Sequence, residues 1–131
     1  MPRRDTRSYA WDMLRALDLV VGFAKGKTFG DYQSDAMLRS AVERQLIVVG
    51  EALAQLTRYA PDIAAGIPQS RRIVAFRNIL VHGYAVVQSR IVWDTVLADV
   101  PMLREHLRSL LAEAIDPCGK GPGVDETPRQ S

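Results

Sequence analysis

The sequence is short of cysteine, of net charge and of long hydrophobic runs, and each shortage excludes a class of protein. Cys118 is the only cysteine among 131 residues, so neither an intrachain disulfide nor a multi-cysteine metal site can form. The formal net charge is only +2, which is too small for a broad basic surface that coats nucleic acid. The longest apolar stretches, such as residues 46–49, are far too short to span a bilayer, and no signal-peptide-like run follows residues 1–5. We therefore expect a cytoplasmic protein with no membrane contact.

Several familiar motifs of catalysis are also missing. The chain has no glycine-rich phosphate loop, no Cys–His metal pattern and no nucleophilic triad spacing. We therefore expect neither a metal nor a cofactor. What the sequence does have is 47% hydrophobic and 24% charged residues, a composition that suits one folded domain of this length.

Hydrophobic residues recur at helical spacing along most of the chain. In the first periodic segment Ala10, Leu14 and Leu17 are three or four residues apart, which is typical of an amphipathic helix. The same pattern predicts helices at about 6–24, 35–59, 70–81 and 89–114, with a short turn or single helical turn at 28–34. No segment alternates with a period of two, so no strand is predicted. The predicted fold is all-α, an up-and-down bundle of four or five helices over residues 1–115, followed by a flexible tail at 116–131.

Three residues should modify these helices. Pro61 is expected to break the chain after the second long helix, and Pro101 is expected to kink or split the last one. Gly50 lies inside the second long helix, where it costs roughly 1 kcal/mol of helix propensity. We expect that Gly50 allows a neighbouring helix to approach closely.

The segment from Arg77 to Tyr84 carries an arginine, an amide, a histidine and a phenol within a few residues of one another. Each helical residue advances about 100°, so the directions of Arg77 and His82 differ by about 140°. The two side chains converge on one small ligand only if the helix loosens near Gly83 or if a second subunit completes the site.

These residue types suit phosphoryl transfer on RNA. Arginine presents a planar, permanently charged fork that matches phosphate oxygens, and histidine moves protons near neutral pH. RNA supplies its own nucleophile, the ribose 2′-hydroxyl, so this chemistry needs no metal. The same residue types also occur on ordinary helix surfaces, and residue types alone leave that interpretation open.

The pattern R-x4-H-x-Y, here R-N-I-L-V-H-G-Y, resembles the signature of the HEPN superfamily and is most similar to the HepT-like toxins. The other segments that resemble this family are 43–52, 76–78, 92–96 and 99–103, and the resemblance covers about residues 8–112. One departure is Gln69, because many relatives carry a tryptophan after the proline at this point. We expect that position to matter for packing and not for catalysis.

This resemblance implies a metal-independent endoribonuclease whose catalytic pair is Arg77 and His82, with Asn78 as a supporting polar residue. It implies a homodimer, or a higher even-numbered oligomer, in which two copies of the motif face each other. It also implies the toxin of a type VII-like toxin–antitoxin system. The partner is then a cognate small nucleotidyltransferase antitoxin that transfers AMP to Tyr84, placing a negative charge beside Arg77 in competition with RNA phosphate.

Five more residues are candidates for supporting roles. Glu43, Arg44 and Glu51 lie on one predicted helix and could line the cleft, although a solvated ion-pair face also explains them. Arg71 and Arg72 could bind the RNA backbone or simply keep their helix soluble.

A second hypothesis belongs to a different class of protein. The chain could be a non-catalytic helical module that binds a nucleotide or docks a nucleotidyltransferase, but a scaffold would not need both Arg77 and His82. Neither side chain is obviously needed for the core, so replacing either with alanine is expected to abolish RNA cleavage while the bundle stays folded. Trp11 and Trp93 lie on apolar stripes, and we expect them to pack in the core.

Overall fold

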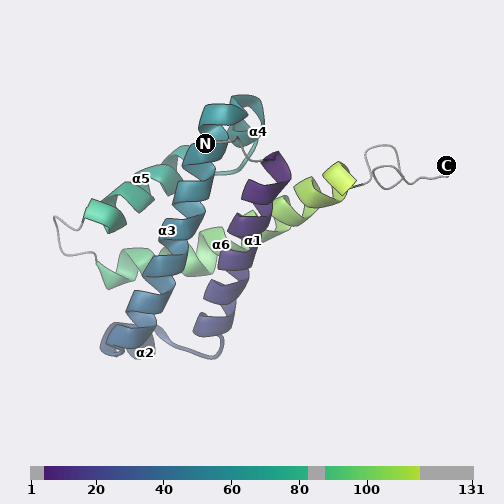
Figure 1. Cartoon of the computed structure of the whole chain (residues 1–131). Coiled ribbons are helices and arrows are strands. Elements are labelled where there is room, and N and C mark those ends of the chain that lie inside the picture. Colours follow the sequence, from purple (N-terminus) through teal and green to yellow (C-terminus); the bar gives the residue numbers. More distant parts are fainter. Residues whose placement is uncertain (1–4, 83–87, 116–131) are drawn as a thin grey trace.

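The computed structural model describes residues 5–82 and 88–115, and the regular structure within these ranges is entirely helical (Figure 1). The helices are α1 (Thr6–Ala24), α2 (Phe29–Ser34), α3 (Ala36–Tyr59), α4 (Pro61–Ala65), α5 (Ser70–His82) and α6 (Ser89–Ile115). The predicted all-α helical bundle is confirmed, and the four long helices lie close to their predicted bounds. The predictions for Tyr84 and for a tail at 116–131 concern residues outside the described ranges. Within those ranges, no helix is both long enough and apolar enough to cross a membrane.

Helices α1 and α3 lie side by side at the centre of the molecule, and α6 crosses behind them (Figure 1). An aspartate side chain caps the start of α1 and of α3. The carboxylate of Asp5 accepts a hydrogen bond from the backbone N–H of Arg7, and that of Asp35 accepts from Met37 and Leu38. Helix α5 packs on α3, so the helix that carries the Arg77 motif is held against the centre of the bundle.

The core lies mainly between α1, α3 and α6. Its largest fully buried side chains are Tyr32, Met13, Leu17, Leu53, Leu56 and Leu107. Tyr32 on α2 stacks on Trp93 of α6, with ring centroids 5.1 Å apart. Trp93 is therefore a core residue, as predicted. The prediction for Trp11 was wrong, because its side chain is 55% exposed.

The two prolines differ in part from the sequence-based expectation. Pro61 begins α4, because the first N–H groups of a helix have no intrahelical acceptor and a missing one costs little. The break at this point is therefore also the start of a short helix that was not predicted. Helix α6 continues through Pro101, so the expected split does not occur. Pro101 is exposed, and water can solvate the carbonyl group that a proline leaves without a donor.

Candidate active site

The close approach of α3 and α5 places Arg77 in a fixed position. A Cβ atom built on Gly50 would lie 2.2 Å from the Cβ and 2.7 Å from the Cγ of Arg77, and 3.4 Å from the carbonyl oxygen of Ile73. Only glycine leaves room for this contact. The expectation that Gly50 permits close helix packing is confirmed, and the neighbour it accommodates is the arginine of the motif.

The guanidinium group of Arg77 emerges from this contact toward the surface. Its Nη1 donates a hydrogen bond of 2.6 Å to Oδ1 of Asn78, and its Nη2 lies 4.0 Å from Oε1 of Glu51. Its Nε is buried and has no hydrogen-bond partner among the described residues. The structure therefore brings together three of the predicted site residues. Because Nη2 is only at the limit of an ion pair with an exposed carboxylate, a phosphate oxygen can compete for it.

His82 is the last residue of α5 and is exposed. The helix persists to His82, and the loosening that we considered at Gly83 lies outside the described residues. The angular separation of about 140° around the helix axis therefore applies to this pair. Both explanations for a shared site, a loosened helix near Gly83 and completion by a second subunit, therefore stay predictions.

The sequence suggested that Arg77 is not needed for packing, and its buried stem corrects this expectation. Its Cβ and Cγ pack on Gly50, and its side chain is only 29% exposed. Replacing Arg77 with alanine therefore removes packing as well as charge, whereas the exposed His82 can be replaced without opening a cavity.

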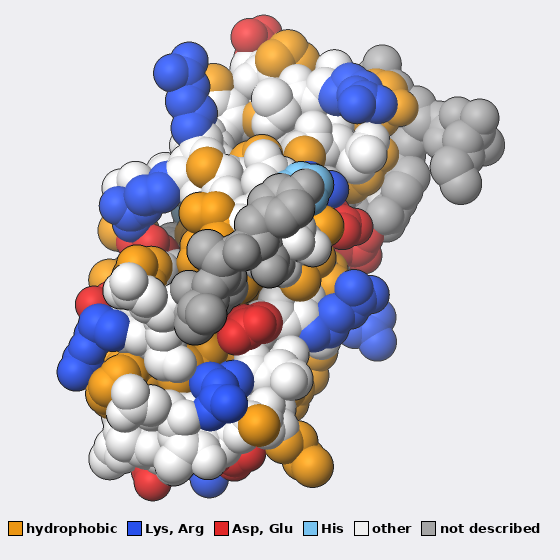
Figure 2. Space-filling model, turned by 90° about the vertical axis from the view of Figure 1, so that its left-hand side faces the viewer, with side chains coloured by type: hydrophobic (Ala, Val, Ile, Leu, Met, Phe, Trp, Pro, Cys, Tyr) orange, Lys and Arg blue, Asp and Glu red, His pale blue; other side chains and the backbone are white. Residues whose placement is uncertain are grey.

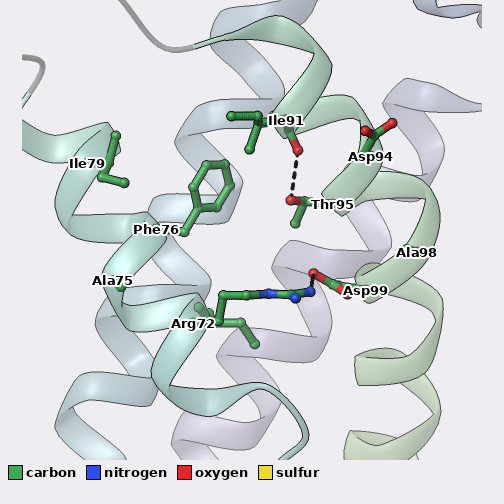
Figure 3. A pocket seen from close by; sticks show the side chains of 10 residues that line it. Arg72, Ala75, Phe76, Ile79, Ile91, Asp94, Thr95, Ala98 and Asp99 are labelled. Carbon is green, nitrogen blue, oxygen red and sulfur yellow. Dashed lines mark hydrogen bonds and ion pairs between the residues drawn. The ribbon is translucent and has the colours of Figure 1, made fainter. Parts of the chain in front are cut away.

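A hollow of about 460 Å³ lies between α5 and α6 (Figure 3). Arg72 reaches across it from α5 and pairs with Asp99 on α6 at 2.5 Å, while Phe76, Ile79 and Ile91 line its apolar side. The carboxylate of Asp99 is 7% exposed, and such a buried charge needs a partner. Arg72 is therefore already committed to an ion pair within the chain.

Among the described residues near α5, the visible basic side chains do not form one continuous area. Figure 2, which views the side of the molecule on which α5 lies, shows separate Lys and Arg side chains with apolar and acidic ones between them. Arg71 is exposed, and it shares with Asn78 a hollow between α5 and the α3–α4 region. The expectation that any RNA contact uses a local basic patch stays a prediction.

The comparisons with known proteins identify the family. A family profile described as "Ribonuclease HepT-like" matches residues 13–110, which is most of the chain and includes α3, α5 and nearly all of α6. The chain belongs to the HepT-like ribonuclease family. This finding confirms the family and the ribonuclease assignment made from the sequence. No solved structure matches the chain.

Three relatives resemble this HepT-like chain over most of its length. A protein named "Putative RNase" from Caldanaerobacter subterraneus subsp. tengcongensis is 30% identical over 105 residues, covering 80% of this chain and 93% of the relative. Another of that name from Methanocaldococcus jannaschii is 28% identical over 107 residues, covering 82% and 97%. A "Probable ribonuclease HepT" from Thermococcus cleftensis is 30% identical over 108 residues, also covering 82% and 97%.

Two residues that were predicted to support the site, Arg44 and Glu43, lie away from Arg77. Arg44 is exposed on α3, two turns before Glu51, roughly 10 Å away along the helix axis. Glu43 lies in the same region of α3, where burial raises its carboxyl pKa and the positive charge of Arg39 opposes that shift. The charge of Glu43 in turn adds to the effect of burial, which raises the pKa of the Tyr32 hydroxyl. The structure therefore associates Glu43 with the α2–α3 end of the bundle.

Replacing Glu43 with glutamine is expected to make the protein more stable at neutral pH. A carboxyl whose folded pKa is raised stabilises the fold while it is protonated, and this contribution is lost as pH rises through the folded pKa. The melting temperature of Glu43→Gln should therefore rise relative to the wild type as pH increases above 4.5, the ordinary value, with little difference below it. Glu105→Gln, at an exposed site on α6, is the matched control. A difference that does not grow with pH would contradict this account.

Sequence reasoning missed three residues beside Arg77. Tyr9 and Asp12 on α1 and Gln55 on α3 line a hollow of about 250 Å³ together with Glu51 and Arg77. Gln55 could have been found, because it is four residues after Glu51 and shares its helix face. No local signal marks Tyr9 or Asp12, since only the packing of α1 against α3 brings them here. The described residues contain no group of three His, Cys, Asp or Glu side chains that could hold a metal ion.

Proposed function

We propose that this chain is a metal-independent endoribonuclease toxin of a type VII-like toxin–antitoxin system. Arg77 holds the scissile phosphate and His82 moves the proton, with two copies of the chain forming the site. A small nucleotidyltransferase antitoxin silences the toxin by transferring AMP to Tyr84. Membership of the HepT-like ribonuclease family supports this proposal.

The observation that carries the proposal is the mounting of Arg77. Helix α3 has a glycine at position 50, where a Cβ atom would collide with the stem of Arg77. The guanidinium group then reaches the surface, and its Nη2 lies 4.0 Å from Oε1 of Glu51. An ordinary surface arginine needs no such arrangement. A fixed guanidinium suits a phosphate whose negative charge grows in the transition state.

The proposed reaction uses only groups of the RNA and the protein. His82 takes the proton of the ribose 2′-hydroxyl, and the 2′ oxygen forms a bond to phosphorus as the bond to the 5′ oxygen breaks. The proton that His82 took from the 2′ oxygen passes to the leaving 5′ oxygen, so the products are a 2′,3′-cyclic phosphate and a 5′-hydroxyl. Arg77 offsets the charge on the phosphate oxygens during this exchange.

An exposed apolar strip beside the motif supports pairing of two chains. Ile79 is 53% exposed and lies three residues before His82, on the same side of α5. Val81 and Ile91 are also exposed. A second copy that covers these side chains would lie next to His82, and that is where a composite site needs it.

Mixing two inactive variants tests the shared site. If each site takes Arg77 from one copy and His82 from the other, dimers of Arg77→Gln with His82→Ala contain one intact site. Random exchange should then restore about a quarter of the wild-type rate. The measurement is RNA cleavage after co-refolding, with each variant refolded alone as the control.

Absence of rescue, with mixed dimers confirmed by native mass, would show that each chain carries a complete site. A chain that sediments as a monomer at the assay concentration would remove the composite site from the proposal altogether.

Tyr84 is expected to be the target of the antitoxin. Co-expression with the nucleotidyltransferase should raise the intact mass of the chain by one AMP and silence cleavage, because a phosphodiester near Arg77 competes with RNA. Tyr84→Phe should keep cleavage activity and remain unmodified. A mass increase that persists in Tyr84→Phe would place the modification on another residue.

A further inference from the structure

Helix α5, which carries Arg77 and His82, is held differently on two of its sides. On one side the stem of Arg77 packs so closely on Gly50 of α3 that no Cβ atom fits between them. On another side a hollow of about 460 Å³ separates α5 from α6 (Figure 3). Ile79 and Ile91 line this hollow and are 53% and 51% exposed, so they do not close it by packing. Close packing therefore fixes α5 against α3 but not across the hollow.

An ion pair crosses the hollow instead. Nη2 of Arg72, on α5, lies 2.5 Å from Oδ2 of Asp99, on α6. The side chain of Asp99 is 7% exposed, and the next residue, Val100, belongs to the core. The side chain of Arg72 is 62% exposed. Asp99 is therefore fixed to the centre of the bundle, whereas Arg72 extends to it from a helix with an open side.

Stability alone does not explain a buried carboxylate at position 99. Removing a charge from water costs free energy that its partner often does not fully return, and apolar side chains of similar volume frequently give an equally stable fold. Phe76, Ile79 and Ile91 already make this hollow suitable for an apolar residue. What a charged pair adds is a defined distance and direction between an atom of α5 and an atom of α6.

The direction of Arg72 makes the pair sensitive to rotation of α5. Arg72 and Arg77 are five residues apart, so they project about 140° apart around the helix axis, and the two contacts together resist rotation about that axis. Without the pair, a turn of about 10° would move a side-chain atom that is about 6 Å from the axis by about 1 Å. A displacement of that size at a catalytic group lowers the rate about 100-fold.

We propose that Arg72 and Asp99 are positioning residues of the ribonuclease site. Their ion pair fixes the rotation of α5 and thereby sets where Arg77 and His82 lie relative to α3 and to the RNA. This assignment rests on the proposed roles of Arg77 and His82. It gives Arg72 a part in the reaction that needs no contact with RNA.

The test uses Asp99→Ala, because this change separates positioning from stability. Arg72 can turn to water when its partner is lost, whereas removing Arg72 would leave a buried charge unpaired. Asp94→Ala is the matched control, since Asp94 lines the same hollow but pairs with Arg90 of its own helix, at 3.9 Å. In Asp99→Ala, kcat for RNA cleavage should fall about 10- to 100-fold with KM nearly unchanged, and the melting temperature should stay within a few degrees of the control. Arg72→Lys keeps a charged partner for Asp99 and should retain much of the rate.

Hydrogen exchange of the α5 amides, measured on the same proteins, gives a readout that does not depend on activity. It should be faster in Asp99→Ala than in Asp94→Ala, with exchange in α1 unchanged. A wild-type kcat in Asp99→Ala overturns the positioning role and leaves the ribonuclease standing. So does a change in KM alone, which would make Arg72 an RNA contact, and so does a loss of rate that only follows a loss of folded protein.

A wild type that does not cut RNA overturns the proposed function. Faster exchange of α5 in Asp99→Ala than in Asp94→Ala would then still support the positioning of this helix by the ion pair. Equal exchange in the two variants, without cleavage by the wild type, overturns both proposals.

Discussion

Replacing Gly50 with alanine is expected to destabilise the protein and to remove most of its RNA cleavage. The new Cβ would lie 2.2 Å from the Cβ of Arg77, and ordinary contact begins at 3.4 Å. The obstructing atom is attached to the backbone of α5, so the helices must separate. Alanine gains roughly 1 kcal/mol of helix propensity, but overpacking costs about 1–3 kcal/mol or more, and here we expect overpacking to dominate. A shift on the order of 1 Å at a catalytic group lowers the rate about 100-fold.

The matched control is Gly22→Ala. Gly22 lies in α1, and a Cβ atom at this position would have nothing within 4 Å of it, so alanine there should raise the melting temperature through helix propensity alone. Thermal unfolding and cleavage rates of the two variants are compared under one condition. If Gly50→Ala were as stable and as active as Gly22→Ala, the close packing of α3 on Arg77 would not matter for the site.

Replacing Arg77 is expected to remove cleavage through the loss of its guanidinium fork. Arg77→Gln keeps much of the stem that packs on Gly50, so the fold should survive while the rate falls about 10²–10³-fold. Arg77→Lys keeps the charge but not the planar pair of donors, and should recover only a small part of the rate. Arg77→Ala should also lower stability, because the stem contact is lost. Circular dichroism melts and single-turnover cleavage rates measure these effects.

Two outcomes would contradict this role of Arg77. If Arg77→Lys cut RNA at the wild-type rate, a charge alone would be enough and the fork would be irrelevant. If Arg77→Gln raised KM and left kcat unchanged, Arg77 would bind RNA without stabilising the transition state.

Much of the fold could be predicted because its signals are local. The three-and-four spacing of apolar residues gave the bounds of α1, which the structure describes as Thr6–Ala24. The exposure of Trp11 could not be predicted, since the width of a buried stripe depends on which helices cover it. The small helix after Pro61 was missed because proline signals both an end and a beginning.

The site was predictable only where its residues are neighbours in sequence or share one helix. Arg77 and Asn78 are adjacent, and Glu51 directly follows Gly50, the residue that we expected to permit close helix packing. The ion pair of Arg72 with Asp99 joins residues 27 positions apart, and nothing in the spacing signals it. The same holds for Asp12, which reaches the neighbourhood of Arg77 only through helix packing.

Cleavage of RNA by His82 without a metal can be measured directly on the purified protein. Purified wild-type protein and His82→Ala are incubated with RNA in EDTA, and the rate of new 2′,3′-cyclic phosphate ends is followed. We expect the wild type to cleave RNA and His82→Ala to do so about 10²–10⁴-fold more slowly, with the helical fold of the variant intact. Equal rates for the two proteins, or cleavage by the wild type only after a divalent metal is added, would contradict it.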